Sequence, residues 1–185
     1  MSDVTKILSA IERGDQQAAE QLLPAVYQEL RKLAAAKLSQ QKPGQTLQPT
    51  MLVHEAYVRL VDVDQQQQWN SRGHFFAAAG EAMRRILVEK ARQKQSQKRA
   101  HVVEHDAVDE LPDIPQTHKL DLLALDEALS DFERQWPEKA RLVKLTYFAG
   151  FTTKEAAETL GISERTAERT WTYAKVWMLQ AIEGN

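Results

Sequence analysis

Apolar residues recur at helical spacing along most of this chain, and this periodicity constrains its fold more than any other feature. Glycine and proline, which most often interrupt helices, number only 7 and 6 among 185 residues and lie mainly between the periodic segments. No stretch shows the strict polar–apolar alternation that is typical of a half-buried strand. The sequence therefore predicts an all-α fold.

The periodic segments form two groups separated by a stretch of different composition. In the first group, we expect Pro24 to kink or divide the second of four helices, which cover residues 4–12, 15–38, 49–62 and 71–99. Residues 100–119 contain two prolines, three histidines and five acidic residues with weak periodicity, which is typical of a linker. Helical spacing resumes at Leu120. We therefore expect one module over 1–99, a linker over 100–119 and a second module over 120–185.

Several classes of protein are disfavoured by what the sequence lacks. Without cysteine, the chain has no disulfides, thiolate metal sites or cysteine nucleophile. The zinc-protease pattern His-Glu-x-x-His fails because Val58 stands where the second histidine would follow His54. Neither a glycine-rich phosphate loop nor a Ser/His/Asp arrangement can be assembled. We therefore expect no catalytic residue, metal or cofactor. The short apolar runs and the N-terminal sequence predict a cytoplasmic protein without a membrane partner.

Charge is distributed unevenly along the chain. The net charge is only −2, yet residues 71–101 hold eight Lys/Arg and two Asp/Glu, whereas residues 102–120 hold one and five. A basic block in an otherwise acidic chain is typical of a local contact with nucleic acid, although a solvated helix face would carry the same charges.

Residues 150–178 contain the pattern of a helix-turn-helix. Thr152 and Glu155 fit a capping box, Gly161 provides a turn, and Ser163 can cap a second helix. The small pair Ala156-Ala157 would let the two helices approach closely, and we expect Ile162 to fill the angle between them. An ordinary helical hairpin with a charged outer face is the alternative.

The second helix of this pattern separates apolar from polar residues. Ala167, Trp171, Ala174 and Met178 recur on one face, and we expect Trp171 and Trp177 to lie in the core. The side chains that remain for solvent, and that we predict to contact duplex DNA, are Arg165, Thr166, Glu168, Arg169, Thr172 and Lys175. Arginine can bond bidentately to guanine, at roughly 1–3 kcal/mol per pair.

Aromatic residues precede the basic block, a combination suited to single-stranded nucleic acid. Phe76 continues an apolar stripe and is expected in the core, whereas Trp69 and Phe75 could be either core or stacking residues. Arg84 and Arg85 lie off that stripe, so we expect them to contact phosphates or an acidic partner.

Three stretches together resemble the sigma-70 family of RNA polymerase initiation factors, and specifically an ECF-like branch of the extracytoplasmic-function (ECF) subfamily. They read LQPTMLVHEAYVRL over 47–60, HFFAAAGEAMRRILV over 74–88, and SERTAER over 163–169 followed by Trp171. The resemblance covers nearly the whole chain except the linker.

The resemblance implies a division of labour between the modules. The first would dock on the β′ clamp helices of RNA polymerase core and hold the melted −10 strand, and the second would read the −35 duplex and touch the β flap. The implied core-polymerase contacts are His54, Glu55, Arg59 and Asp62. The −10 contacts are Trp69, Asn70, Arg72, His74 and Phe75, to which Arg84 and Arg85 are added. The −35 contacts are those named above.

Two departures limit what the resemblance transfers. Thr170 and Thr172 stand where many relatives carry an acidic residue and an arginine, so the −35 sequence does not transfer. Glu89-Lys90 replaces a common Asp-His pair. The resemblance also allows an anti-sigma protein as a partner, which the sequence does not identify. A helix-turn-helix regulator acting without the polymerase is the competing interpretation, and it would normally bind paired half-sites as a dimer.

Overall fold

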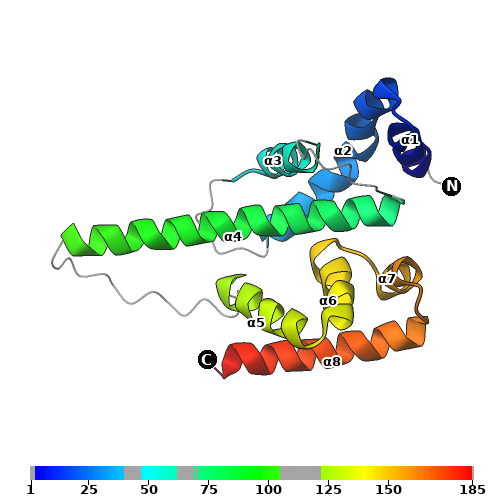
Figure 1. Cartoon of the computed structure of the whole chain (residues 1–185). Helices are drawn as coiled ribbons and strands as arrows, with labels where there is room; N and C mark the ends of the chain where they lie inside the picture. Colours follow the sequence, from blue (N-terminus) through cyan, green and yellow to red (C-terminus); the bar gives the residue numbers. More distant parts are fainter. Residues whose placement is uncertain (1–2, 40–46, 62–68, 70, 105–121, 185) are drawn as a thin grey trace.

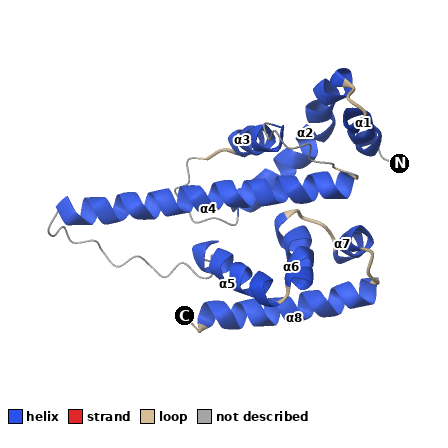
Figure 2. Cartoon of the chain, in the orientation of Figure 1, coloured by secondary structure: helices blue, strands red, loops and turns tan. Residues whose placement is uncertain are grey.

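The computed structural model describes residues 3–39, 47–61, 69, 71–104 and 122–184, and every regular element among them is helical (Figures 1 and 2). The all-α prediction is confirmed. None of the described helices is both long enough and apolar enough to cross a bilayer.

The first four helices pack around one apolar cluster. They are α1 (Asp3–Glu12), α2 (Gln16–Ser39), α3 (Pro49–Val61) and α4 (Arg72–Glu104). Leu30 of α2, Leu52 of α3 and Met83 of α4 are fully buried in this cluster. The Asp15 carboxylate caps α2 by accepting from the N–H groups of Gln17 and Ala18, at 2.9 and 3.3 Å.

Helix α2 is continuous, and one boundary differs from that expected. Of the two effects expected of Pro24, a kink or a division, the division does not occur: the helix continues although proline cannot donate to a carbonyl one turn earlier. Helix α4 reaches Glu104, five residues into the segment expected as a linker. The rest of that segment, 105–119, lies outside the described residues.

The remaining helices pack mainly against one another. They are α5 (Leu122–Gln135), α6 (Pro137–Val143), the π-helical turn η1 (Lys144–Phe148), α7 (Thr153–Leu160) and α8 (Glu164–Glu183). Phe132, Ala140 and Ala174 are fully buried between α5, α6 and α8. Figure 1 shows these helices on one side of α4, with α2 and α3 on the other.

Candidate nucleic-acid interface

Helix α7 begins with the capping box expected from the sequence. The Thr152 hydroxyl accepts from the N–H of Glu155 at 3.2 Å, and the Glu155 carboxylate accepts from the N–H of Thr152 at 2.8 Å. These hydrogen bonds hold the pKa of Glu155 below its ordinary value. Both free amides at the start of α7 therefore have acceptors within the chain.

The turn between α7 and α8 follows most of the predictions. Gly161 adopts the left-handed conformation, with a φ of 67°, and ends α7. Ser163 caps α8, because its hydroxyl accepts from the N–H of Thr166 at 3.1 Å. Ile162 differs from the expectation: the residue is 37% exposed rather than enclosed between the helices.

Small residues bring α7 and α8 together, as expected. Ala156 and Ala157 of α7 and Ala167 of α8 are buried in one cluster, where larger side chains would separate the helix axes. Trp171 and Trp177 are partly buried against apolar clusters, so their assignment to the core is confirmed.

Most side chains exposed on the outer face of α8 between Arg165 and Lys175 are polar, and Tyr173 is exposed beside them. All six side chains predicted to contact duplex DNA are exposed there: Arg165, Thr166, Glu168, Arg169, Thr172 and Lys175. The Thr172 hydroxyl donates to the carbonyl of Glu168 at 2.9 Å, and the Lys175 ammonium lies 5.6 Å from the ring centroid of Trp171. The face therefore offers cations, hydroxyls and one carboxylate to a partner.

The residues around the start of α4 are less uniform. The indole of Trp69 packs edge-on against Phe75, with ring centroids 5.3 Å apart, and its Nε1 is buried without an acceptor among the described residues. Arg72 pairs with Glu29 and lies 4.9 Å from the ring centroid of Phe76. His74 is exposed, and Asn70 lies outside the described residues.

Phe75 requires a correction. Its ring is completely buried among α1–α4, so in this structure it cannot stack on a base. The physical reason is that Phe75, Ala79 and Met83 form a second inward row beside that of Phe76, because α4 is covered over a wide arc. Phe76 is buried as expected.

The two arginines in the middle of α4 have different surroundings. The Arg84 side chain is 12% exposed and pairs with Glu81 on its own helix, at 2.7 Å, and with Asp126 on α5. Arg85 is 66% exposed and lies 3.3 Å from Glu81. Only Arg85 is open to a phosphate in this conformation.

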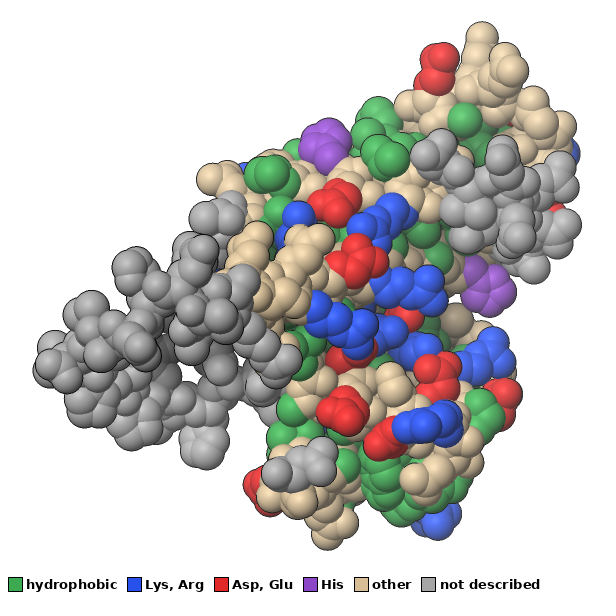
Figure 3. Space-filling view, turned by 60° about the vertical axis from the view of Figure 1, so that its left-hand side comes forward, with side chains coloured by type: hydrophobic (Ala, Val, Ile, Leu, Met, Phe, Trp, Pro, Cys, Tyr) green, Lys and Arg blue, Asp and Glu red, His purple; other side chains and the backbone are tan. Residues whose placement is uncertain are grey.

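The exposed face of α3 carries the predicted core-polymerase contacts. His54 is exposed, and Asp62 lies outside the described residues. The Arg59 guanidinium donates to Glu55 at 3.3 Å and to Glu89 of α4 at 2.7 Å, and the hydrogen bond to Glu89 lowers the pKa of that carboxyl. Figure 3 shows cationic and acidic side chains gathered in a band across the middle of the molecule.

One family is found by comparison with known proteins. The family model described as ECF sigma factor matches residues 1–184. The chain belongs to this family. The resemblance inferred from the sequence is therefore confirmed, and a role in transcription initiation follows from it. ECF sigma factors are DNA-binding initiation factors, and they work with RNA polymerase core and promoter DNA. No curated protein and no solved structure matches the chain.

An apolar stripe on α3 of this sigma factor was not predicted from the sequence. Met51, Val58 and Val61 are each more than half exposed, and His54 lies between them on the same face. With His54 included, these residues are three, four and three positions apart, out of register with the buried row of Leu52, Ala56 and Leu60, and this spacing was the available signal. Such a row of exposed apolar side chains is typical of a protein contact.

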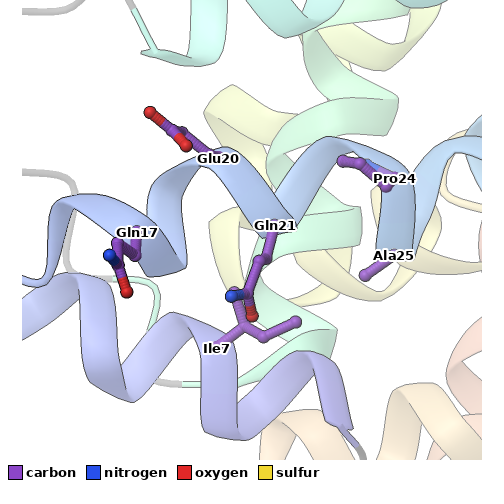
Figure 4. Close-up of a pocket in the computed structure, with 6 residues that line it drawn as sticks. All are labelled: Ile7, Gln17, Glu20, Gln21, Pro24 and Ala25. Carbon is purple, nitrogen blue, oxygen red and sulfur yellow. The ribbon is translucent and has the colours of Figure 1, made fainter.

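Elsewhere in the described residues, polar side chains do not gather into a ligand-binding or metal site. A hollow between α1 and α2 is lined by Ile7, Gln17, Glu20, Gln21, Pro24 and Ala25 (Figure 4). Gln21 lies over Ile7, whereas the Glu20 carboxylate points away from both. Within the described parts of the chain, no three His, Asp or Glu side chains gather as metal ligands.

Proposed function

We propose that this sigma factor binds core polymerase through α3, the −10 strand through the start of α4, and the −35 duplex through α8. The observation that carries the proposal is the outer face of α8. Six polar side chains are exposed there on its early turns, while its opposite face is buried against α5–α7. The competing regulator would leave the basic first module without a role.

The early turns of α8 suit a contact in the major groove. An α-helix fits this groove, and residues near its N-terminus reach the base edges. Arg165 and Arg169 lie one turn apart on the exposed face. Bidentate bonds from either guanidinium to guanine would give specificity, and Lys175 would contact the DNA backbone further along the helix.

The start of α4 suits a single strand more than a duplex. Trp69 is the stacking residue in this proposal. The buried ring of Phe75 packs edge-on against the indole and holds it in place, and does not itself contact a base. Arg72, His74 and Arg85 supply polar contacts, together with Asn70. Stacking contributes about 1–3 kcal/mol per base in proteins of this kind.

The polymerase contact combines apolar and charged groups on α3. Met51, Val58 and Val61 would bury apolar area against the β′ clamp helices, and His54, Glu55 and Arg59 would fix the orientation. Residues 1–99 and 120–185 act as two modules in this proposal, and the second also contacts the β flap. Each module has apolar clusters of its own.

Mapping of transcript starts tests the proposed function. Core polymerase of the source organism would be incubated with its genomic DNA, with and without the purified protein, and RNA 5′ ends would be sequenced. We expect discrete starts that depend on the protein and share two spaced upstream elements. An unchanged set of starts would overturn the proposal.

A matched pair of variants assigns the upstream element. Arg165→Ala with Arg169→Ala should remove dependence on the −35 element. Arg134→Ala removes a cation that is exposed at the end of α5, outside the proposed interface, and should leave the starts unchanged.

A further inference from the structure

The outer face of α8 continues past the residues proposed to contact duplex DNA, and there it becomes apolar. Tyr173, Val176 and Leu179 are each 42–52% exposed. The opposite face of α8, which includes the buried Ala174, packs against α5–α7. Figure 1 shows α8 along the edge of the molecule, with α5, α6 and α7 all on one side of it. A second helix can therefore lie along the outer face without meeting α5–α7.

Val176 lies at the centre of this face. It follows the buried Ala174 by two residues, which is a rotation of about 200° around the helix axis, so it faces away from the core. Tyr173 and Leu179 lie three residues before and after Val176 and flank it on the two edges of the face. A contiguous group of exposed apolar side chains is typical of a contact with another protein surface.

Two opposite charges lie equally far from Val176 on the same face. Arg169 precedes Val176 by seven residues and Glu183 follows it by seven, and seven residues are close to two turns, or about 10 Å along a helix. Both side chains are exposed, and neither has an ion-pair partner among the described residues. The last turn of α8 holds no basic residue, although the helix dipole disfavours an anion there. A cation from outside α8 would therefore stabilise Glu183.

We propose that a second copy of the chain binds this face through the same face of its own α8, in the antiparallel direction and around a two-fold axis at Val176. In this arrangement Arg169 of each copy lies opposite Glu183 of the other, and the two Val176 side chains meet at the axis. A parallel arrangement would bring like charges together at both positions, which is unfavourable. The charges therefore favour this partner and this direction.

The dimer contact is short. It extends from Arg169 to Glu183, which is about 20 Å of helix in each copy. Such an area is smaller than that of a permanent dimer, so we expect self-association in the micromolar range. Arg169 also belongs to the face proposed for the −35 duplex, so the dimer is a state of the protein away from DNA. The inference does not otherwise depend on the proposed function.

Sedimentation velocity of the full-length protein tests the proposal. Over about a hundredfold range of concentration, we expect the average mass to rise from one chain toward two. Glu183→Arg and Arg169→Glu each replace both opposite-charge pairs with like charges, so each should weaken self-association by at least about tenfold. The matched control is Glu12→Arg, the same change at the exposed last residue of α1, which should associate like the parent.

An equimolar mixture of the two single variants gives a sharper result. A mixed dimer has two acidic groups on one copy opposite two arginines on the other, so both pairs are restored. We expect the mixture to regain the self-association that each variant lacks alone, and the double variant Arg169→Glu with Glu183→Arg to regain it as well. The proposal would be overturned by a parent that stays monomeric, by dimers that the single variants leave unchanged, or by a mixture that stays monomeric.

Val176→Asp distinguishes a second copy from RNA polymerase as the occupant of this face. It places two carboxylates together at the two-fold axis, so we expect self-association to be lost while helical circular dichroism is retained. Loss of affinity for core polymerase with self-association unchanged would assign the face to the polymerase and overturn the proposal. Sedimentation needs neither DNA nor polymerase, so its outcome is independent of transcript mapping.

Discussion

Lys37, near the end of α2, has its ammonium buried against the ring of Phe148. Burial lowers the pKa of Lys37 to about 7, helped by nearby Arg84 and opposed by the carboxylate of Glu81. The unfolded chain holds this proton up to the ordinary value of 10.5, so unfolding takes up a proton between pH 7 and 10.5. The free energy of unfolding should therefore rise with pH over that window.

Lys37→Met tests whether the lowered pKa of Lys37 causes this pH dependence. We expect the wild-type protein to gain on the order of 1–3 kcal/mol in unfolding free energy between pH 7 and 9.5, measured in urea. Lys37→Met should remove most of that gain and be more stable than wild type at pH 7. The control Lys6→Met, at an exposed position on α1, should retain the gain. An equal pH dependence in all three proteins would contradict the assignment.

Whether a single side chain is buried could be predicted from the sequence only where it belongs to a recognisable helical row of apolar residues. Phe76 lies on a clear helical row and was assigned correctly, whereas its neighbour Phe75 was assigned to DNA. The width of the buried face of α4 depends on how α1–α3 surround it, which local spacing does not contain. Arg84 was predicted to contact phosphates or an acidic partner, and its partners within the chain are acidic; Asp126 could not be identified in advance because it is 42 residues away.

Among the helices, α7 and α8 show which features can be predicted from residues close together in the sequence. The capping box at Thr152, the left-handed Gly161 and the cap at Ser163 were all predicted, because each depends on hydrogen bonds within four residues. The exposure of Ile162 was not predicted, since it depends on the angle between two helices. The π-helical turn η1 had no local signal in the sequence.

Thr152→Ala should destabilise the protein by about 1 kcal/mol, because the N–H of Glu155 loses the hydroxyl that accepts from it and the Glu155 carboxylate loses the hydroxyl that donates to it. Urea unfolding at pH 7 measures the change. Thr153→Ala, one residue later and outside the box, should have less than half that effect. A smaller loss for Thr152→Ala than for Thr153→Ala would show that the box contributes nothing.

The exposed stripe of α3 makes a separate prediction. Val58→Asp should weaken binding to core polymerase by at least about tenfold, since it places a charge in an apolar contact. Val58 is exposed in the free protein, so the unfolding free energy should change little. Ala25→Asp, with the same charge change on an exposed position of α2, is the control. Binding is measured by fluorescence anisotropy, and equal affinity for the two variants would exclude α3 as the docking surface.

At the scale of the whole molecule, the sequence predicts helices and modules but not the contact between them. Gly80 and Ala149 are 69 positions apart, and nothing near either residue indicates that their backbones meet. The five extra residues of α4 beyond position 99 were missed because weak periodicity was read as a linker. Membership of the family could be inferred from the long motifs. That inference came from the resemblance and not from helix spacing or capping.

In the proposed function, α8 recognises duplex DNA while the start of α4 binds a separated strand. One measurement separates these two roles: it follows holoenzyme on one promoter with a fluorescent base in the −10 element. We expect Arg169→Ala to weaken promoter binding, whereas Trp69→Ala should bind normally and open the duplex more slowly. A template already unpaired at −10 should restore Trp69→Ala but not Arg169→Ala. The division of roles would be contradicted if both variants lost promoter binding equally and the unpaired template restored both of them or neither.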